Sequence, residues 1–241
     1  IANDEAEISE VVRRRLFEPI EPGKHPYRDA VVQGFAKLYR DQREDFPGEC
    51  SDGAYKDELL ASYPVHPELF RRLYDDWSTL DRFQRTRGVL RLLARVIHRL
   101  WESQDAGLLI LPSSIPMDDG SICDELTIYL PNQWEAIISQ EVDGPKSLPL
   151  ELDRTNPNLG RISACSRVAR ALYVGTAPGA DSPNPGVGAE RIRLACAQPG
   201  EPSALFVDAL RRIMDKGRYV QQDLNRYWIS TRANLNRTAH D

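Results

Sequence analysis

Three arginines at regular spacing are the most distinct chemical feature of the sequence. Arg87, Arg91 and Arg95 stand four residues apart within 84–102, where the apolar residues also recur at helical spacing. Side chains four residues apart share one helix face, so these guanidinium groups repel one another unless negative charge compensates them. A guanidinium can bind a phosphate group or pair with a carboxylate. The stripe therefore has two interpretations: contact with a phosphate, or ion pairs with an adjoining helix in this acidic region.

A second basic group lies near the C-terminus. Residues 202–216 have helical periodicity, and aromatic and β-branched residues on both sides of the polar turn QQDLN are typical of a β-hairpin. Helices expected at about 163–174 and 188–197 precede them, and the order helix, helix, helix, hairpin indicates a winged helix-turn-helix. Basic side chains there would contact nucleic-acid phosphates in a salt-dependent, sequence-tolerant way. The candidates are Arg211, Arg212, Lys216, Arg218 and Arg226.

Acidic residues beside these candidates keep a different interpretation open. Glu201, Asp208 and Asp215 lie on or next to the 202–216 helix. A winged helix that contacts protein is therefore as good an interpretation as one that contacts DNA. The nearby aromatic residues, Tyr219, Tyr227 and Trp228, are expected in the hairpin core rather than in a platform for base stacking.

Signatures of catalysis and metal binding are missing from the sequence. Gly144-Pro145-Lys146-Ser147 lacks the first glycine of a phosphate loop, and its proline removes a backbone donor. The sequence has no GxSxG elbow, and its four cysteines and four histidines are scattered without CxxC or HExxH spacing. We therefore predict no catalytic residues and no metal site in this chain.

Composition indicates a folded, soluble protein. Of the 241 residues, 41% are hydrophobic and 28% are charged, and no apolar run is long enough to cross a membrane. No signal peptide is visible, and unpaired cysteines fit a reducing cytoplasm. The first residue is Ile rather than Met, so we expect the chain to be a piece of a longer protein.

The distribution of charge and periodicity predicts two units. The net charge is −10 over 1–156 and +5 over 157–241. The stretch 145–161 is rich in Pro, Asn and Gly, so we place a boundary there, between domains 1–156 and 157–241. Further segments of the first domain are expected to be helical, and GLLIL at 107–111 to be a short strand or a helix start. The expected helices of the first domain are 4–17, 27–44, 54–62, 67–77, 84–102, 121–130 and 132–142.

Several blocks of the sequence resemble one known family. The longest block is YPVHPELFRRLYDDWSTLDRFQRTRGVLRLLARVIHRLW at 63–101. The other blocks are the opening EISEVVRRRLFE, the middle YLPNQWEAIISQEV and the end RYVQQDLNRYWISTRANLNR, and together they occur in the order expected of the family. They resemble large bacterial and archaeal AAA+ ATPases catalogued as domain-of-unknown-function 499, often encoded beside DNA methyltransferases or in defence-type operons. The phosphate loop and Walker B strand of that family are missing and would lie before Ile1.

The resemblance implies a mainly helical fold: an AAA+-like lid bundle, then a winged-helix module with a small β-hairpin. In such lids an arginine in a Gly-x-x-Arg helix start touches the γ-phosphate side of ATP. Gly88-Val-Leu-Arg91 matches, which makes Arg91 the first candidate for nucleotide sensing and Arg87 the second. ATP and Mg would be bound by the parent protein, through its N-terminal core, and not by this chain alone.

Two functions follow as expectations. In the first, the chain is the regulatory C-terminal region of a AAA+ ATPase, which senses nucleotide state and binds DNA or a DNA-bound partner. The alternative is a non-catalytic scaffold that docks a partner such as a methyltransferase-like or defence-system subunit. A self-contained enzyme has little support, since no catalytic constellation is visible in the sequence.

Overall fold

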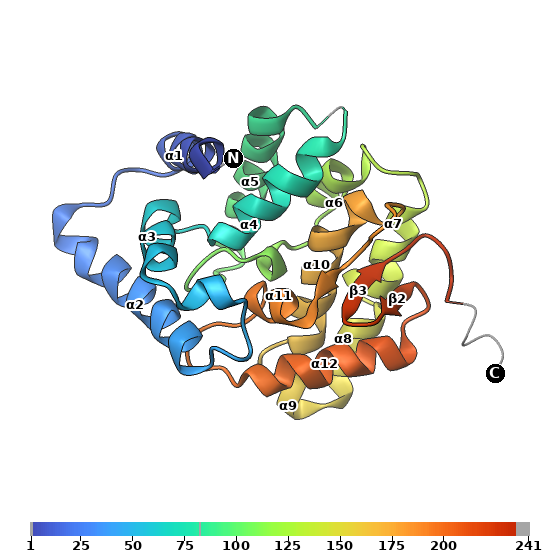
Figure 1. Cartoon of the computed structure of the whole chain (residues 1–241). Coiled ribbons are helices and arrows are strands. Elements are labelled where there is room, and N and C mark those ends of the chain that lie inside the picture. The colour runs from blue at the N-terminus through green and yellow to red at the C-terminus, as the bar shows by residue number, and fades with distance from the viewer. Residues whose placement is uncertain (1, 82, 235–241) are drawn as a thin grey trace.

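Helices make up most of the protein, as the sequence predicts. The computed structural model describes residues 2–81 and 83–234, which contain twelve α-helices and a small three-stranded antiparallel sheet (Figure 1). Within that range, no helix has the length and apolar character that crossing a lipid bilayer requires. The first five helices are α1 (Ala2–Leu16), α2 (His25–Asp41), α3 (Gly53–Ser62), α4 (Pro67–Arg71) and α5 (Arg85–Glu102).

The amphipathic pattern of α5 orients it on the core. Val89, Leu92, Leu93 and Val96 are buried along one side of this helix. Antiparallel to it runs α6 (Gly120–Thr127), which begins at an Asp119 side chain that accepts hydrogen bonds from the backbone N–H groups of Ser121 and Ile122. The α5–α6 pair forms one side of the molecule.

Two segments depart from the predicted regular elements. The expected helix 67–77 is interrupted, because α4 continues as one turn of π-helix over Arg72–Asp76 and a short 3-10 turn. The GLLIL segment forms a single parallel bridge, in which Ile110 pairs with Val65. The bridge orders residues 64–66 against 110 without building a second sheet.

The Pro-, Asn- and Gly-rich stretch contains helices. After α7 (Trp134–Ile137) come α8 (Leu148–Thr155) and α9 (Pro157–Gly160), each with a proline in its first turn, where the missing N–H is tolerated. Buried Asp153 then caps the long helix α10 (Ala164–Thr176). Its carboxylate accepts the backbone N–H groups of Cys165 and Ser166 at 2.9 and 3.0 Å.

The C-terminal elements follow the predicted order, with one strand added. They are β1 (Val187–Gly188), α11 (Ala189–Leu194), α12 (Ser203–Lys216), β2 (Val220–Asp223) and β3 (Arg226–Ile229). The sheet order is β1-β3-β2, with both pairs antiparallel. The predicted hairpin is confirmed, whereas β1 was not predicted.

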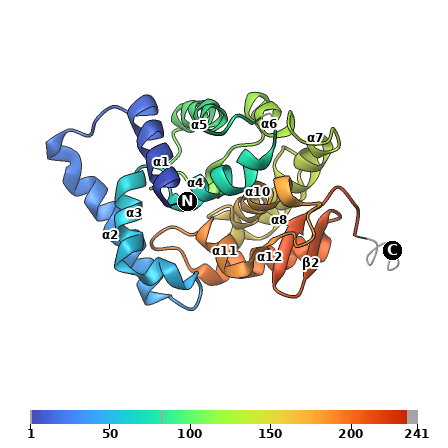
Figure 2. The same ribbon diagram turned by 45° about the horizontal axis from the view of Figure 1, so that its top comes forward.

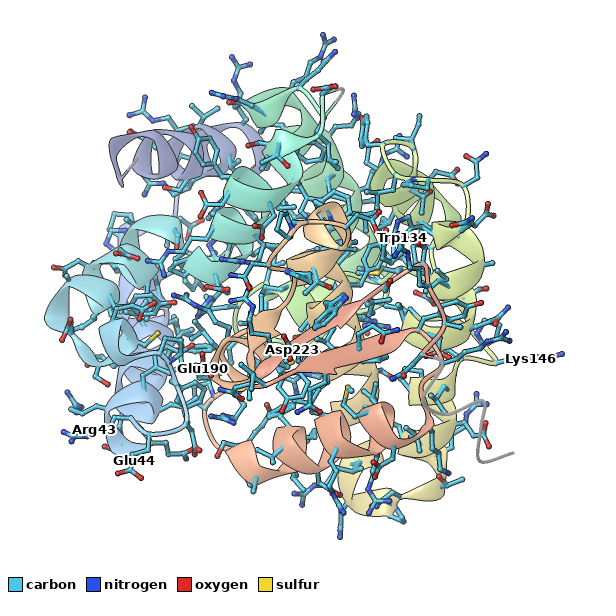
Figure 3. All side chains as sticks on the ribbon, turned by 45° about the vertical axis from the view of Figure 1, so that its right-hand side comes forward. Arg43, Glu44, Trp134, Lys146, Glu190 and Asp223 are labelled. Atoms are coloured by element: carbon cyan, nitrogen blue, oxygen red, sulfur yellow. The ribbon has the colours of Figure 1, made fainter. Side chains whose placement is uncertain are left out.

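The central helix α10 joins both halves of the chain. In Figures 1 and 2 it lies between the α5–α6 side and the side that contains α12 and the sheet. Val174 on α10 accepts a hydrogen bond from the indole of Trp77 at 2.8 Å, and Tyr173 packs edge-on against Trp134, which Figure 3 shows among the helices. One hydrophobic core runs across the predicted boundary at 156/157, and the division into two domains stays a prediction.

Candidate functional site

The start of α5 is shaped by a close backbone contact. Gln84 and Arg85 have left-handed φ angles of 59° and 39°, so the chain turns sharply before the helix. A Cβ atom on Gly88 would lie 1.9 Å from the carbonyl oxygen of Phe83, so glycine is required here. The glycine of the Gly-x-x-Arg motif thus has a structural reason: it lets the preceding turn pack onto the helix.

This end of α5 is electropositive. The first turn has no acidic residue, and no side chain caps it by a hydrogen bond, so the positive end of the helix dipole is not neutralised there. Arg85 and Arg87 are exposed, and neither forms an ion pair within the part of the chain that the structure describes. Such an arrangement can attract an anion.

Arg91, one turn further along, is held by α6. Its Nε donates to Oε1 of Glu125 at 2.6 Å, and its Nη2 donates to the hydroxyl of Tyr129. The hydrogen bond to Glu125 raises the pKa of the Arg91 guanidinium above its usual value. Arg95 lies 3.8 Å from the other oxygen of Glu125. The interpretation of the stripe as ion pairs with an adjoining helix is therefore confirmed for Arg91 and Arg95.

The two nucleotide-sensing candidates thus differ in state. Arg87 is exposed and unpaired within the described residues, whereas Arg91 is engaged by a carboxylate that is itself 7% exposed. Sequence reasoning missed Glu125, because the partner of Arg91 lies 34 positions away. Arg85 was also missed, since it falls outside the four-residue spacing.

The basic residues of α12 are partly neutralised. Arg211 and Arg212 both bind the carboxylate of Asp208, at 2.6 and 2.9 Å. The hydrogen bond from Arg211 holds the pKa of Asp208 below its usual value, so this carboxylate is charged at neutral pH. Lys216 is exposed in the last turn of the helix. The exposed face of α12 therefore has a small positive charge rather than a dense basic patch.

Arg218 precedes β2, and Arg226 begins β3. The backbone N–H of Arg218 donates to the Glu141 carboxylate at 2.9 Å, and its guanidinium lies over the ring of Tyr219. The side chain of Arg226 donates to backbone carbonyls of residues 184–186, including Pro185 at 2.8 Å. Arg226 thus fixes the 184–186 loop to β3, a structural contact that the sequence did not indicate.

A buried polar network, also missed from the sequence, links three distant segments. Buried His66 accepts the backbone N–H of Glu68 on Nδ1, so its proton is on Nε2, which lies 2.8 Å from the Tyr39 hydroxyl. Burial lowers the pKa of His66 to about 3, so the imidazole is neutral. Glu68 pairs with Arg72 at 3.1 Å and with Arg191 of α11 at 2.9 Å. The signal available in the sequence was the group of polar residues within the apolar block 63–77.

The comparisons with known proteins give one match. The model of the DUF499 second domain matches residues 3–185, about three quarters of the chain. This chain belongs to the DUF499 family. No curated protein and no solved structure matches it.

The family match divides the candidate residues of this DUF499 chain. The matched range contains α1 to α10, and with them the arginines of α5 and their partners on α6. It ends at residue 185, before β1, α11, α12 and the hairpin. Within residues 2–81 and 83–234, no three His, Cys, Asp or Glu side chains are placed to hold a metal ion. The Gly144–Ser147 segment packs against the backbone of Ser139, and Lys146 points away from the body of the molecule (Figure 3).

Proposed function

We propose that this DUF499 domain is the C-terminal regulatory region of a AAA+ ATPase, with a helical lid followed by a winged-helix module. The lid senses the nucleotide state, and the winged helix binds DNA or a DNA-bound partner in the cytoplasm. ATP and Mg are bound by an N-terminal nucleotide-binding core of the same protein. This chain supplies arginine side chains toward the nucleotide and no metal ligand.

The unpaired Arg87 at the positive end of α5 carries the nucleotide-sensing proposal. A phosphate there would meet an exposed guanidinium at the positive end of the helix dipole, without breaking an existing ion pair. The clamp of Arg91 by Glu125 fixes the orientation of α5 relative to α6. A contact at Arg87 would therefore move the α5–α6 pair as a unit when the γ-phosphate is gained or lost.

Kinetics of the full-length ATPase test this proposal. We expect Arg87→Ala to lower ATP turnover at least about tenfold, because it removes a phosphate contact that acts on the transition state. Arg91→Ala should lower turnover as well, because α5 is then no longer fixed to α6 through Glu125. Arg95→Ala is the matched control, since Arg95 is also exposed on α5 and faces Glu125 but lies nearly three turns from the helix start. Equal effects of all three substitutions would contradict a specific role of Arg87.

The 241-residue chain alone should not hydrolyse ATP, and hydrolysis that survives Arg91→Ala and stringent purification would also contradict the proposal.

The order of C-terminal elements supports the winged-helix part. Helix, strand, helix, helix and a two-stranded hairpin succeed one another in α10, β1, α11, α12, β2 and β3, and the first strand pairs with the last. This is the arrangement of winged helix-turn-helix modules, in which the third helix and the hairpin are the parts available to a partner. Here those parts are α12 and the β2–β3 turn.

Fluorescence anisotropy with duplex DNA tests the nucleic-acid role. Binding by the 241-residue chain should weaken between about 50 and 200 mM salt and be lost in the double variant Arg211→Glu/Arg212→Glu. Asp208→Asn is the matched opposite: it removes the carboxylate that both arginines bind, and should tighten binding. No binding at low salt, or no response to either variant, would remove DNA from the proposal.

A protein-docking scaffold is the second candidate, and one feature of α12 favours it. An apolar hollow of about 230 Å³ lies between α11, α12 and β3, with Phe206, Val207, Met214 and Tyr227 among its lining. The acidic Asp223 ends β2 at the hairpin turn, where Figure 3 shows it, and would oppose a phosphate backbone. A partner protein, such as a methyltransferase-like subunit, would use the apolar hollow. Absence of DNA binding combined with capture of such a subunit would favour this candidate.

A further inference from the structure

A groove runs beneath the connection between α1 and α2, and its lining contains none of the candidate residues discussed above. It consists of two hollows, of about 660 and 430 Å³, that share Ile20, Arg28 and Tyr63 in their lining. Phe17 and Pro64 extend the wall of the larger hollow. Figures 1 and 2 show α1 and α2 at the end of the molecule opposite the hairpin. Because the two hollows share residues, they form one continuous surface rather than two separate pockets.

The groove has the residue types of a protein interface. Tyr27, on the first turn of α2, is 75% exposed beside the smaller hollow, and Tyr63 lies in both hollows. Pro19 and Ile20 add apolar surface from the connection. Tyrosine and arginine are enriched where proteins bind one another, and an exposed tyrosine of this size is a typical anchor. An apolar side chain of a partner would be buried against Pro19, Ile20 and Tyr63.

The larger hollow is predominantly basic, whereas in the smaller one Lys24 and Arg28 are balanced by Glu18 and Glu21. Arg13, Arg14, Arg28 and His25 line the larger hollow, and Glu18 is the acidic residue in that lining. Two of these arginines form ion pairs with exposed carboxylates, which stabilise the protein only slightly. Arg14 pairs with Glu10 one turn earlier on α1, and Arg28 pairs with the adjacent Asp29. Arg13 is exposed and makes no ion pair within the described residues. A carboxylate entering the larger hollow would therefore meet guanidinium groups from both α1 and α2.

We propose that this groove docks an acidic segment of a partner protein, with apolar side chains placed over Tyr63 and Ile20 and carboxylates facing Arg13 and Arg28. Apolar walls from Phe17, Pro19 and Pro64 favour a peptide over a nucleic acid, because a phosphate backbone would leave that surface without a counterpart. Two joined hollows of about 660 and 430 Å³ suit a segment of chain rather than a single small anion.

Peptide binding to the 241-residue chain tests the proposal. The probe is a fluorescein-labelled peptide of about 15 residues in which Leu and Phe recur at helical spacing between Glu and Asp, and its twin has Lys at every acidic position. We expect the acidic peptide to bind at least about tenfold more tightly than the twin, as measured by fluorescence anisotropy. The double variant Arg13→Glu/Arg28→Glu should reverse this preference, so that the basic twin gains affinity.

Two controls separate docking from general charge and from misfolding. Arg15→Glu changes a neighbouring exposed residue of α1 that does not line the groove, and should leave the preference for the acidic peptide in place. Tyr27→Ala should weaken the acidic peptide and keep the order of the two peptides. Equal binding of both peptides, an effect of Arg15→Glu as large as that of the double variant, or displacement of the acidic peptide by ATP or duplex DNA would overturn the proposal. Circular dichroism of each variant checks that it is folded, so that a gain in affinity for the basic peptide can be assigned to the native protein.

Discussion

Arg191 on α11 places its Nη1 2.9 Å from Oε2 of Glu68 on α4, although the two residues are 123 positions apart. Glu68 is 1% exposed and also pairs with Arg72, so its charge is compensated from both halves of the chain. The pair thereby connects α4 of the proposed lid to α11 of the proposed winged helix. It is a direct polar link between the two, alongside the hydrogen bond from Ser203 at the start of α12 to Asp45.

Removing Arg191 should therefore destabilise the protein. Arg191→Ala leaves buried Glu68 with Arg72 alone, and we expect the free energy of unfolding in urea to fall by about 3 kcal/mol. Glu68→Met combined with Arg191→Met should lose less than the sum of the two single substitutions, because no buried charge is left unpaired. Strict additivity of the double-mutant cycle would contradict the coupling. Arg43→Ala, at the exposed position labelled in Figure 3, is the neutral control.

Acid stability should reveal buried His66. Its folded pKa of about 3 lies below the unfolded value of 6.5. Between these two pH values the imidazole is protonated in the unfolded chain and neutral in the native protein. This contribution to the free energy of unfolding is complete above pH 6.5 and is lost as pH falls toward 3, by up to about 1.4 kcal/mol per pH unit. Urea unfolding of His66→Gln, compared with the original protein over this range, should lack that loss. An unchanged pH profile would contradict a buried neutral imidazole.

Asp76 should act in the opposite direction. Burial raises its pKa to about 6, against 3.8 for the free side chain, although Arg72 lies 2.9 Å away. The native protein therefore binds this proton more tightly than the unfolded chain, and the free energy of unfolding gains from it as pH falls from about 6 to 4. The two groups oppose each other in that window. Urea unfolding should show that Asp76→Asn steepens the loss of stability on acidification between about pH 6 and 4, whereas His66→Gln makes it shallower.

Gly88 should tolerate no side chain. A methyl group there meets the Phe83 carbonyl at 1.9 Å, so either the turn before α5 or the helix must shift. We expect Gly88→Ala to lower the free energy of unfolding by about 3 kcal/mol, even though alanine favours helices. Gly120→Ala is the matched control, because Gly120 begins α6 with open space around its missing Cβ, and should change stability by less than about 1 kcal/mol. Similar effects of the two substitutions would contradict the contact.

The sequence predicted elements that depend on local patterns. Helix α12 was expected at 202–216 and is found at 203–216, because its apolar residues recur at helical spacing and turn residues flank it. Two-residue β1 carries no such pattern and exists only because β3 pairs with it. The helices α8 and α9 were hidden by prolines that lie in first turns, where proline is compatible with a helix.

The candidate sites show the same limit. The spacing of Arg87, Arg91 and Arg95 on one helix was visible in the sequence, and so was a supply of acidic residues. Which arginine is engaged depends on Glu125, and that depends on how α6 packs along α5. Periodicity places residues on a face of their own element, but it does not give the neighbour across the interface.

The difference between Arg87 and Arg91 leads to a separate stability prediction. Arg91→Ala leaves nearly buried Glu125 with Arg95 at 3.8 Å, so we expect a loss of about 1–2 kcal/mol in the free energy of unfolding. Arg87→Ala removes an exposed side chain that has no ion-pair partner within the described residues, and should change stability by less than about 0.5 kcal/mol.

Urea unfolding of the two variants shows whether a loss of ATP turnover comes from a lost nucleotide contact or from a destabilised protein. If Arg87→Ala lowers turnover without affecting stability, the loss lies in the contact with nucleotide. If it destabilises the protein as much as Arg91→Ala does, Arg87 has a structural partner and the nucleotide-sensing role must be withdrawn.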